Sequence, residues 1–196
     1  MALLLDLSNE VLLEIIPYLM QYGLLWVKRL SYTCKRLNAC CVPWVFKTYR
    51  LGLPASSPRL SQSKFDAIAA RLQNFRDRAS YVQDLTLRFG KTNDQDVDDL
   101  FPSRAIPDLI DALSCANKLI SVQLISGQMG KLSLPLWNWL TTKNLSKFNV
   151  GRNLAPPPDA ERYVRVTTFE DYPYEGPMQF LNSNVSFKHA SHNSVL

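Results

Sequence analysis

Three short helical patterns fill the first 51 residues, and their apolar faces are wider than so small a unit could bury. Apolar residues spaced by three and four share one face of a helix. The first pattern consists of Val11, Leu12, Ile15, Ile16 and Leu19. The second consists of Leu24, Leu25, Val27 and Leu30, and the third of Cys34, Leu37 and Cys41. A segment with more apolar surface than it can bury alone typically contacts another protein, so we expect a docking unit here.

The first pattern carries the signals that begin and bend a helix. Ser8 can cap its amino end, and Glu10 in the first turn interacts favourably with the positive end of the helix dipole. Pro17 lies inside the pattern and lacks a backbone N–H, so we expect a kink there. Gly23 marks the turn to the second pattern. The segment closes with Trp44, Val45, Phe46 and Tyr49.

The order of these features resembles the F-box, the helical module that docks a protein onto the Skp-family adaptor of a cullin–RING ubiquitin ligase. The resemblance covers residues 1–51. The matching motifs are LSNEVL (7–12), IIPYL (15–19), LL (24–25), CKRL (34–37) and the pair Trp44 and Phe46. Ser8 stands where F-boxes usually have proline, and Pro17 is unusual within the first helix.

The resemblance also implies which side chains contact the adaptor. They are Leu7, Ser8, Ile15, Leu19, Leu24, Leu30 and Trp44. The residues by themselves leave a second interpretation open, in which the segment is a small helical subdomain packed on the rest of the chain, because amphipathic stripes also form cores.

Length and charge bound the remaining function classes. The 196 residues can hold one domain, or a small module with a companion domain. The net charge of +5 suggests nucleic-acid binding as one possible role. However, the basic residues are scattered, and no Lys/Arg run or base-reading motif is present. Acids interrupt them at Asp94, Asp96, Asp98 and Asp99. Nucleic acid is therefore not favoured as a partner.

Cysteine usage and hydropathy indicate the compartment. The four cysteines are Cys34, Cys40, Cys41 and Cys115, and they form no C-x-x-C pair. This usage is typical of reduced thiols in the cytoplasm or nucleus. No apolar run approaches the roughly 18 residues of a membrane span. The start, MALLLDLSNE, lacks a basic n-region, so we expect neither a secretory signal nor a membrane partner.

The second informative feature is the pattern L-x-x-L-x-L. It begins at Val82, Leu119 and Leu145, with helical patterns between, after a Pro/Ser-rich linker over 52–64. These units predict an α/β fold: a short leucine-rich-repeat-like region of parallel strands and helices over residues 65–155. Met129 would fill the next apolar position of the second unit, and Asn153 the asparagine position of the third. A plain α/β layer with three buried strands remains the alternative.

Beyond residue 155 the pattern fails. Pro156, Pro157 and Pro158 cannot continue a sheet or a helix, so we expect an irregular segment over 156–181. Val164, Val166 and Phe169 can form one more strand within it. The polar stretch 182–196 lacks periodicity, and we expect it to be poorly ordered.

The chemistry-bearing residues do not assemble into a recognisable catalytic motif. The two histidines, His189 and His192, lie in the polar tail, without a third ligand nearby in the sequence. Cys40 and Cys41 have an apolar helical setting typical of structural thiols. The aspartates at 94–99 lack the glycine and closing glutamate of a calcium loop. We therefore expect a chain that is not an enzyme, with no catalytic residues, metal or cofactor.

Together these features predict a substrate-recognition subunit of an SCF-type cullin–RING ubiquitin ligase. The helical module would bind the Skp-family adaptor and, through it, a cullin, and the repeat-like region would hold a target protein that the sequence does not identify. A protein-interaction module without ligase function is the alternative, and a nucleic-acid-binding protein is a third, less favoured class.

Overall fold

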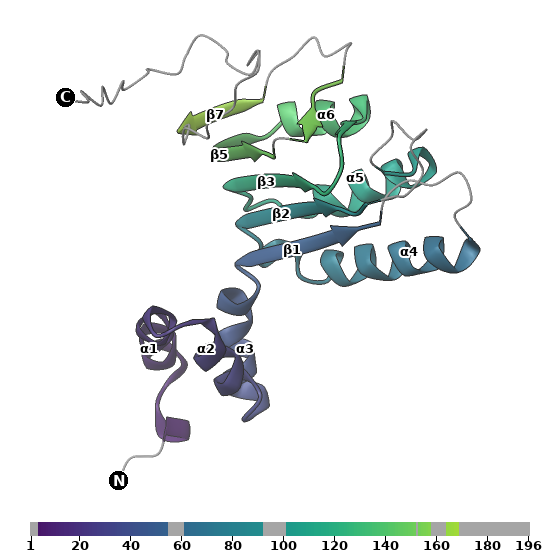
Figure 1. The fold of residues 1–196 in the computed structure, drawn as a ribbon. Coiled ribbons are helices and arrows are strands. Elements are labelled where there is room, and N and C mark those ends of the chain that lie inside the picture. The colour runs from purple at the N-terminus through teal and green to yellow at the C-terminus, as the bar shows by residue number, and fades with distance from the viewer. Residues whose placement is uncertain (1–3, 55–60, 92–100, 152, 158–163, 169–196) are drawn as a thin grey trace, which may run out of the picture.

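A small helical module precedes a parallel sheet that helices cover on one side (Figure 1). The computed structural model describes residues 4–54, 61–91, 101–151, 153–157 and 164–168. The predicted 182–196 tail, most of the predicted irregular segment 156–181, His189, His192 and the aspartates at 94–99 lie outside these residues.

The module consists of three helices that follow a short 3-10 turn, η1 (Leu4–Asp6). They are α1 (Asn9–Gln21), α2 (Leu24–Ser31) and α3 (Lys35–Val45). They enclose a core of their own, separate from that of the sheet. Its buried members are Leu12, Ile16, Val27, Leu37, Cys40 and Cys41.

The local sequence explains where these helices begin. Ser8 is extended and its hydroxyl accepts a hydrogen bond from the N–H of Val11 at 3.4 Å, which caps α1 as predicted. Gly23 has a φ of 114°, a backbone conformation that residues with a side chain rarely adopt, and it allows α2 to start after only two intervening residues. α1 continues through Pro17 to Gln21, so the proline does not end the helix.

The strand–helix region is built around a five-stranded parallel sheet. Its strands, in spatial order, are β1 (Thr48–Leu53), β2 (Asp84–Phe89), β3 (Ser121–Ser126), β5 (Asn144–Val150) and β7 (Arg165–Thr168). Two short strands, β4 (Gly130–Lys131) and β6 (Leu154–Ala155), pair with each other. The helical elements of this region are α4 (Gln62–Arg76), η2 (Ala79–Tyr81), η3 (Ser103–Ala105), α5 (Ile106–Ser114) and α6 (Leu134–Thr141).

The predicted α/β class, with a helical module followed by parallel strands and helices, is confirmed. The three L-x-x-L-x-L units supply β2, β3 and β5, which lie side by side and run parallel. The register aligns Leu87 with Leu124, and Leu124 with Val150. Leu85, Leu87, Val122 and Leu124 are buried in one core, against which Phe148 and Val150 pack half-buried.

The helices α4, α5 and α6 all lie on the same side of the sheet (Figure 1). Burial alternates along the strands, since successive side chains point to opposite faces. In β2, Leu85, Leu87 and Phe89 are buried beneath the helices, whereas Arg88 is exposed. The second face of the sheet therefore carries polar side chains.

The sequence did not predict β1. This strand crosses residue 51, where the helical module was expected to end, and includes Gly52 and Leu53 of the expected linker. The glycine and the following proline suggest a loop. However, Leu51 and Leu53 are buried and pair with β2, and tertiary pairing outweighs the weak local preference.

The prediction for Asn153 in the third repeat unit is confirmed, whereas the prediction for Met129 in the second unit is not. Asn153 donates from its Nδ2 to the carbonyl oxygen of Ser126 at 3.2 Å, so it satisfies a backbone group of the neighbouring unit as the repeat pattern predicts. Met129 is 78% exposed, so its predicted inward position is wrong. The chain turns there to form β4 instead of continuing β3.

The strand expected over Val164, Val166 and Phe169 forms as β7 (Arg165–Thr168). Val164, just before it, is buried, and Phe169 lies outside the described residues. Among the described residues, no helix combines the length and apolarity that crossing a bilayer demands.

Candidate protein-docking surface

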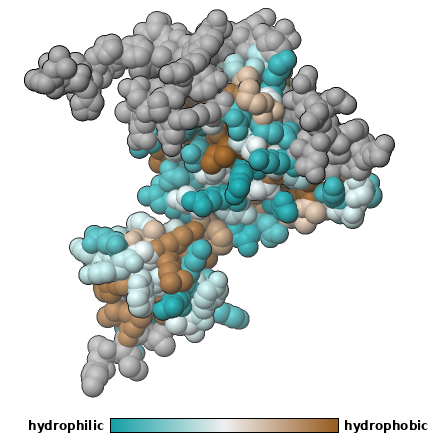
Figure 2. Space-filling view, viewed as in Figure 1, coloured by the Kyte–Doolittle hydropathy of each residue, from teal (hydrophilic) through white to brown (hydrophobic). Residues whose placement is uncertain are grey.

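Exposed apolar side chains concentrate on the helical module. Among the described residues, eight of the eleven exposed large apolar side chains belong to it: Leu4, Val11, Leu13, Tyr18, Tyr22, Leu25, Trp26 and Tyr32. Figure 2 shows brown residues gathered on the visible face of this module, whereas the visible face of the sheet region is largely teal. Exposed apolar patches of this kind are typical of surfaces that contact other proteins, which makes this surface the candidate site.

Part of this surface is a stripe along α1. Val11, Ile15, Tyr18 and Tyr22 recur at spacings of three and four, so they share one side of the helix. Tyr18 is 66% exposed and Tyr22 77%, while Ile15 is half-buried. The stripe borders the residues that face the module's core, and it widens the apolar face of α1 beyond what α2 and α3 cover.

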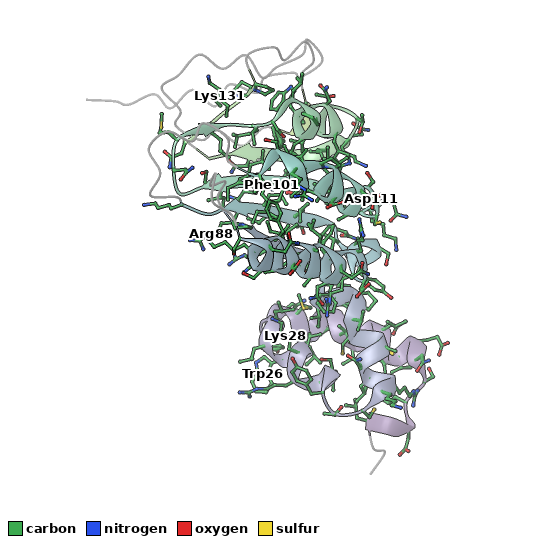
Figure 3. The ribbon with its side chains drawn as sticks, turned by 90° about the vertical axis from the view of Figure 1, so that its right-hand side faces the viewer. Trp26, Lys28, Arg88, Phe101, Asp111 and Lys131 are labelled. Atoms are coloured by element: carbon green, nitrogen blue, oxygen red, sulfur yellow. The ribbon has the colours of Figure 1, made fainter. Side chains whose placement is uncertain are left out.

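α2 adds an aromatic and basic side to the module. Leu25 and Trp26 are exposed, and the guanidinium carbon of Arg29 lies 5.4 Å from the centre of the Trp26 ring. Trp26 and Lys28 project outward from the module in Figure 3. Exposed tryptophan, tyrosine and arginine are the residue types that dominate the energetics of protein interfaces.

The residues predicted to contact the adaptor divide into two groups. Leu7, Leu19, Leu30 and Trp44 are half-buried and pack against the module's own core. The other three lie nearer the surface: Ile15 and Leu24 are half-buried, and Ser8 is exposed at the cap of α1. The structure therefore gathers the first group around the core instead of spreading it over an outer face.

None of the exposed large apolar residues of the module was predicted as a contact from the sequence. They are Leu4, Val11, Leu13, Tyr18, Tyr22, Leu25, Trp26 and Tyr32. The signal that could have found those on α1 is the width of its apolar face. One helix of this length packs only part of such a face against two short neighbours, so the flank carrying the tyrosines stays outside.

Hydrogen bonds fix the segment that leads into α1. Arg36 of α3 donates to the Asn9 side-chain oxygen at 2.8 Å and to the carbonyl oxygen of Leu7. The carboxyl of Glu10 accepts hydrogen bonds from its own backbone N–H and from the Ser8 hydroxyl, which together lower its pKa, with a further contribution from the charge of Arg36. The residues around Leu7 and Ser8 are therefore held in place by contacts within the module.

The cysteine pair of α3 belongs to the core. Cys40 is 7% exposed and Cys41 is fully buried. Burial raises the pKa of the Cys41 thiol, and the neighbouring Cys40 adds to the effect. A buried protonated thiol is a poor nucleophile. Within the described ranges, no group of three or more His, Cys, Asp or Glu side chains could hold a metal ion.

A groove of about 830 Å³ lies between α5 and the chain entering α6. Its walls are mainly apolar and include Ile106, Ile110 and Leu134. The charged side chains that line it are Asp111 and Lys131, and Asp111 forms an ion pair with Arg76 of α4. The groove thus presents a carboxylate that is paired with Arg76 and the ammonium group of Lys131.

The module and the sheet are joined by a short connection. Phe46 and Lys47 alone separate α3 from β1. The Arg78 guanidinium carbon lies 4.8 Å from the Phe46 ring centre, and the carbonyl oxygen of Lys47 accepts hydrogen bonds from the N–H groups of Gln83 and Asp84 at 2.8 and 3.0 Å. Contacts on both sides of the joint therefore fix the direction in which β1 leaves the module.

Comparison with known proteins finds neither a family model that matches this chain nor a curated protein with a similar sequence.

Proposed function

We propose that this chain is a substrate-recognition subunit of an SCF-type cullin–RING ubiquitin ligase. The helical module binds a Skp-family adaptor, and through it a cullin, while the strand–helix region holds a target protein. The observation that carries the proposal is the exposed aromatic and aliphatic surface of a module that has its own core. The order of F-box-like motifs along the same residues supports it.

The proposal assigns no catalytic step to this chain. Its role is to hold the target near a ubiquitin-charged enzyme, which raises the effective concentration of the two reactants. The short connection at Phe46 and Lys47 suits this role, because its contacts with Arg78, Gln83 and Asp84 join the proposed adaptor-binding and target-binding parts directly. The four free cysteines, of which Cys40 and Cys41 are buried, fit a protein of the cytoplasm or nucleus.

Binding of the purified full chain to a Skp-family adaptor tests the proposal. We expect a one-to-one complex by size-exclusion chromatography and a dissociation constant measurable by calorimetry. The double variant Tyr18→Ala/Tyr22→Ala, on the exposed stripe, should raise that constant about tenfold or more, which corresponds to about 1.4 kcal/mol. The variant Leu7→Ala/Ile15→Ala tests the positions that the sequence predicts, with the same expected loss.

A matched control removes exposed apolar side chains from the other part of the chain. Ile120 and Met129 are 43% and 78% exposed and lie on the strand–helix region. The double variant Ile120→Ala/Met129→Ala should bind the adaptor as the unmodified chain does. Failure of the unmodified chain to bind, or equal affinities for all three variants, would contradict the proposal.

The alternative, an interaction module without ligase function, is favoured by one observation. Ser8 caps α1 through its hydroxyl, at the position where F-boxes usually have proline. Ser8→Pro removes this cap and should cost about 1 kcal/mol of stability. If the position also contacts the adaptor, the variant binds more tightly despite its lower melting temperature. Weaker binding together with lower stability favours the alternative.

A further inference from the structure

We propose that the face of the parallel sheet opposite α4, α5 and α6, which none of the described helices covers, binds an extended, acidic stretch of the target protein. This inference rests on the proposed function, since it specifies the chemistry by which the same chain recognises its target. It concerns the sheet face opposite α4, α5 and α6, and not the helical module.

The strand register places polar side chains in rows across this face. One row runs from Arg50 through Thr86 and Gln123 to Asn149, one residue from each of four neighbouring strands. With strands about 4.8 Å apart, such a row is about 14 Å long, which matches roughly four residues of an extended peptide. All four side chains can donate hydrogen bonds, so the row offers polar anchors along the path of a bound chain.

Neighbouring rows complete the face. They are Thr48, Asp84, Ser121 and Lys147 on one side, and Gly52, Arg88 and Ile125 on the other. Among the side chains of these described rows, the cations are Arg50, Arg88 and Lys147, and the single anion is Asp84. The face therefore carries a net positive charge that suits an acidic partner.

The two arginines are available for binding. Both are exposed, and within the described residues neither forms an ion pair or a side-chain hydrogen bond. Arg88 and Asp111 project in opposite directions in Figure 3, Arg88 from the sheet side and Asp111 from the helix side. Arginine guanidinium groups hold carboxylates through two parallel hydrogen bonds, which favours aspartate and glutamate side chains as ligands.

A glycine keeps the flank of Arg88 open. Gly52 is the register partner of Arg88 on the edge strand β1, and a Cβ added there would meet no atom within 4 Å. A larger residue at this position would occupy the space beside the guanidinium group. Gly52 thus leaves room for a partner's carboxylate between the two arginines.

A nucleic-acid ligand fits this face less well. Proteins that bind single strands stack bases on aromatic side chains. The described residues of the three rows include no aromatic side chain, and Asp84 lies among them, where it would repel phosphate. The observations therefore favour a polypeptide.

Selection from a display library of random short peptides tests the inference, with the full chain in complex with the adaptor as bait. We expect the selected peptides to be enriched in aspartate and glutamate. A synthetic peptide with the consensus sequence should lose affinity about tenfold or more for Arg50→Gln/Arg88→Gln. Gly52→Glu, which places a carboxylate beside Arg88, should weaken binding in the same way.

The matched control has the same change in net charge. Lys64→Gln/Lys118→Gln alters two exposed lysines away from the sheet face and should change the affinity less than about twofold. Circular dichroism melting checks that each variant is folded.

The inference would be overturned if no peptide were selected or if the consensus lacked acidic residues. It would also be overturned if the two double variants lost equal affinity for the peptide. The third contrary result is an oligouridylate that binds more tightly than the peptide and whose binding depends on Arg50 and Arg88. Adaptor binding is measured on the same samples. If the adaptor does not bind, but the free chain still binds acidic peptides through Arg50 and Arg88, the proposed ligase function is wrong and the peptide-binding face is still supported.

Discussion

The backbone N–H of Gly151 donates to the carbonyl oxygen of Leu124 at 2.8 Å, and a Cβ at Gly151 would lie 3.2 Å from that same oxygen. The end of β5 thus approaches β3 as closely as a residue without a side chain allows. This contact precedes the turn in which Asn153 bonds to Ser126, so two consecutive features attach the third strand–helix unit to the second.

Gly151→Ala should destabilise the strand–helix region by about 1–3 kcal/mol, because the added methyl group meets backbone that the sheet holds in place. Gly52→Ala is the matched control, since its methyl group meets nothing within 4 Å. We expect the control to be neutral or slightly stabilising, because it reduces the freedom of the unfolded chain. Urea denaturation of both variants measures the difference, and equal stabilities would refute the close approach.

The core beneath the sheet predicts different stability losses for substitutions on the two faces of β3. Leu124 is fully buried in the middle strand, so Leu124→Ala should cost about 2–5 kcal/mol of unfolding free energy. Ile125 follows it on the opposite face and is half-buried. Ile125→Ala should cost clearly less. A larger loss at Ile125 than at Leu124 would show that the two faces have been assigned in reverse.

Glu10 gives the helical module a pH dependence of known sign. Hydrogen bonds from its backbone N–H and from Ser8 lower its pKa below the ordinary value of 4.5. The folded module therefore favours the carboxylate, and this stabilisation is present above pH 4.5 and lost as the pH falls through the lowered pKa. The stability difference between the unmodified chain and Glu10→Gln should shrink over that range in thermal melts. A difference that does not change with pH would contradict the assignment.

The cysteines report on the two parts of the chain separately. Cys115, at the end of α5, is exposed, whereas Cys40 and Cys41 are buried in the module. Iodoacetamide should modify Cys115 in the folded protein, and the buried pair only when the module unfolds, as peptide mass spectrometry would show. Rapid labelling of Cys41 in the native protein would disprove its burial.

The raised pKa of Cys41 adds a second pH effect. The folded module holds the neutral thiol, so its stability falls as the pH rises past the ordinary thiol value of 9.0, where the unfolded chain loses the proton first. Cys41→Ala should lack this alkaline loss, although the smaller side chain lowers stability at neutral pH.

The sequence predicted those parts of the fold whose apolar periodicity is regular. The triplets beginning at Val82, Leu119 and Leu145 supply three neighbouring parallel strands, because alternating apolar residues require a covered face. β1 was missed because its local residues include Gly52 and its pairing partner β2 lies beyond α4. A short window of sequence does not reveal pairing between strands that lie so far apart in the chain.

The docking surface was only partly predictable for a different reason. Periodicity identifies the apolar side of α1, but it does not show how much of that side the neighbouring helices cover. Leu19 and Trp44 therefore pack against the module's core, while Tyr18 and Tyr22 remain outside. Which residues are left over depends on the crossing of three short helices, and that crossing is a property of the tertiary structure.

The order of the strands determines how far each strand lies from the helical module. β1 is the edge strand that leaves the helical module, and each further strand of the sheet lies about 4.8 Å farther from it. Arg50 thus lies on the strand that follows the module directly, while Lys147 on β5 is about 14 Å farther along the sheet, three strands away. The place where a target sits along this row would decide which of its lysines comes within range of a modifying enzyme.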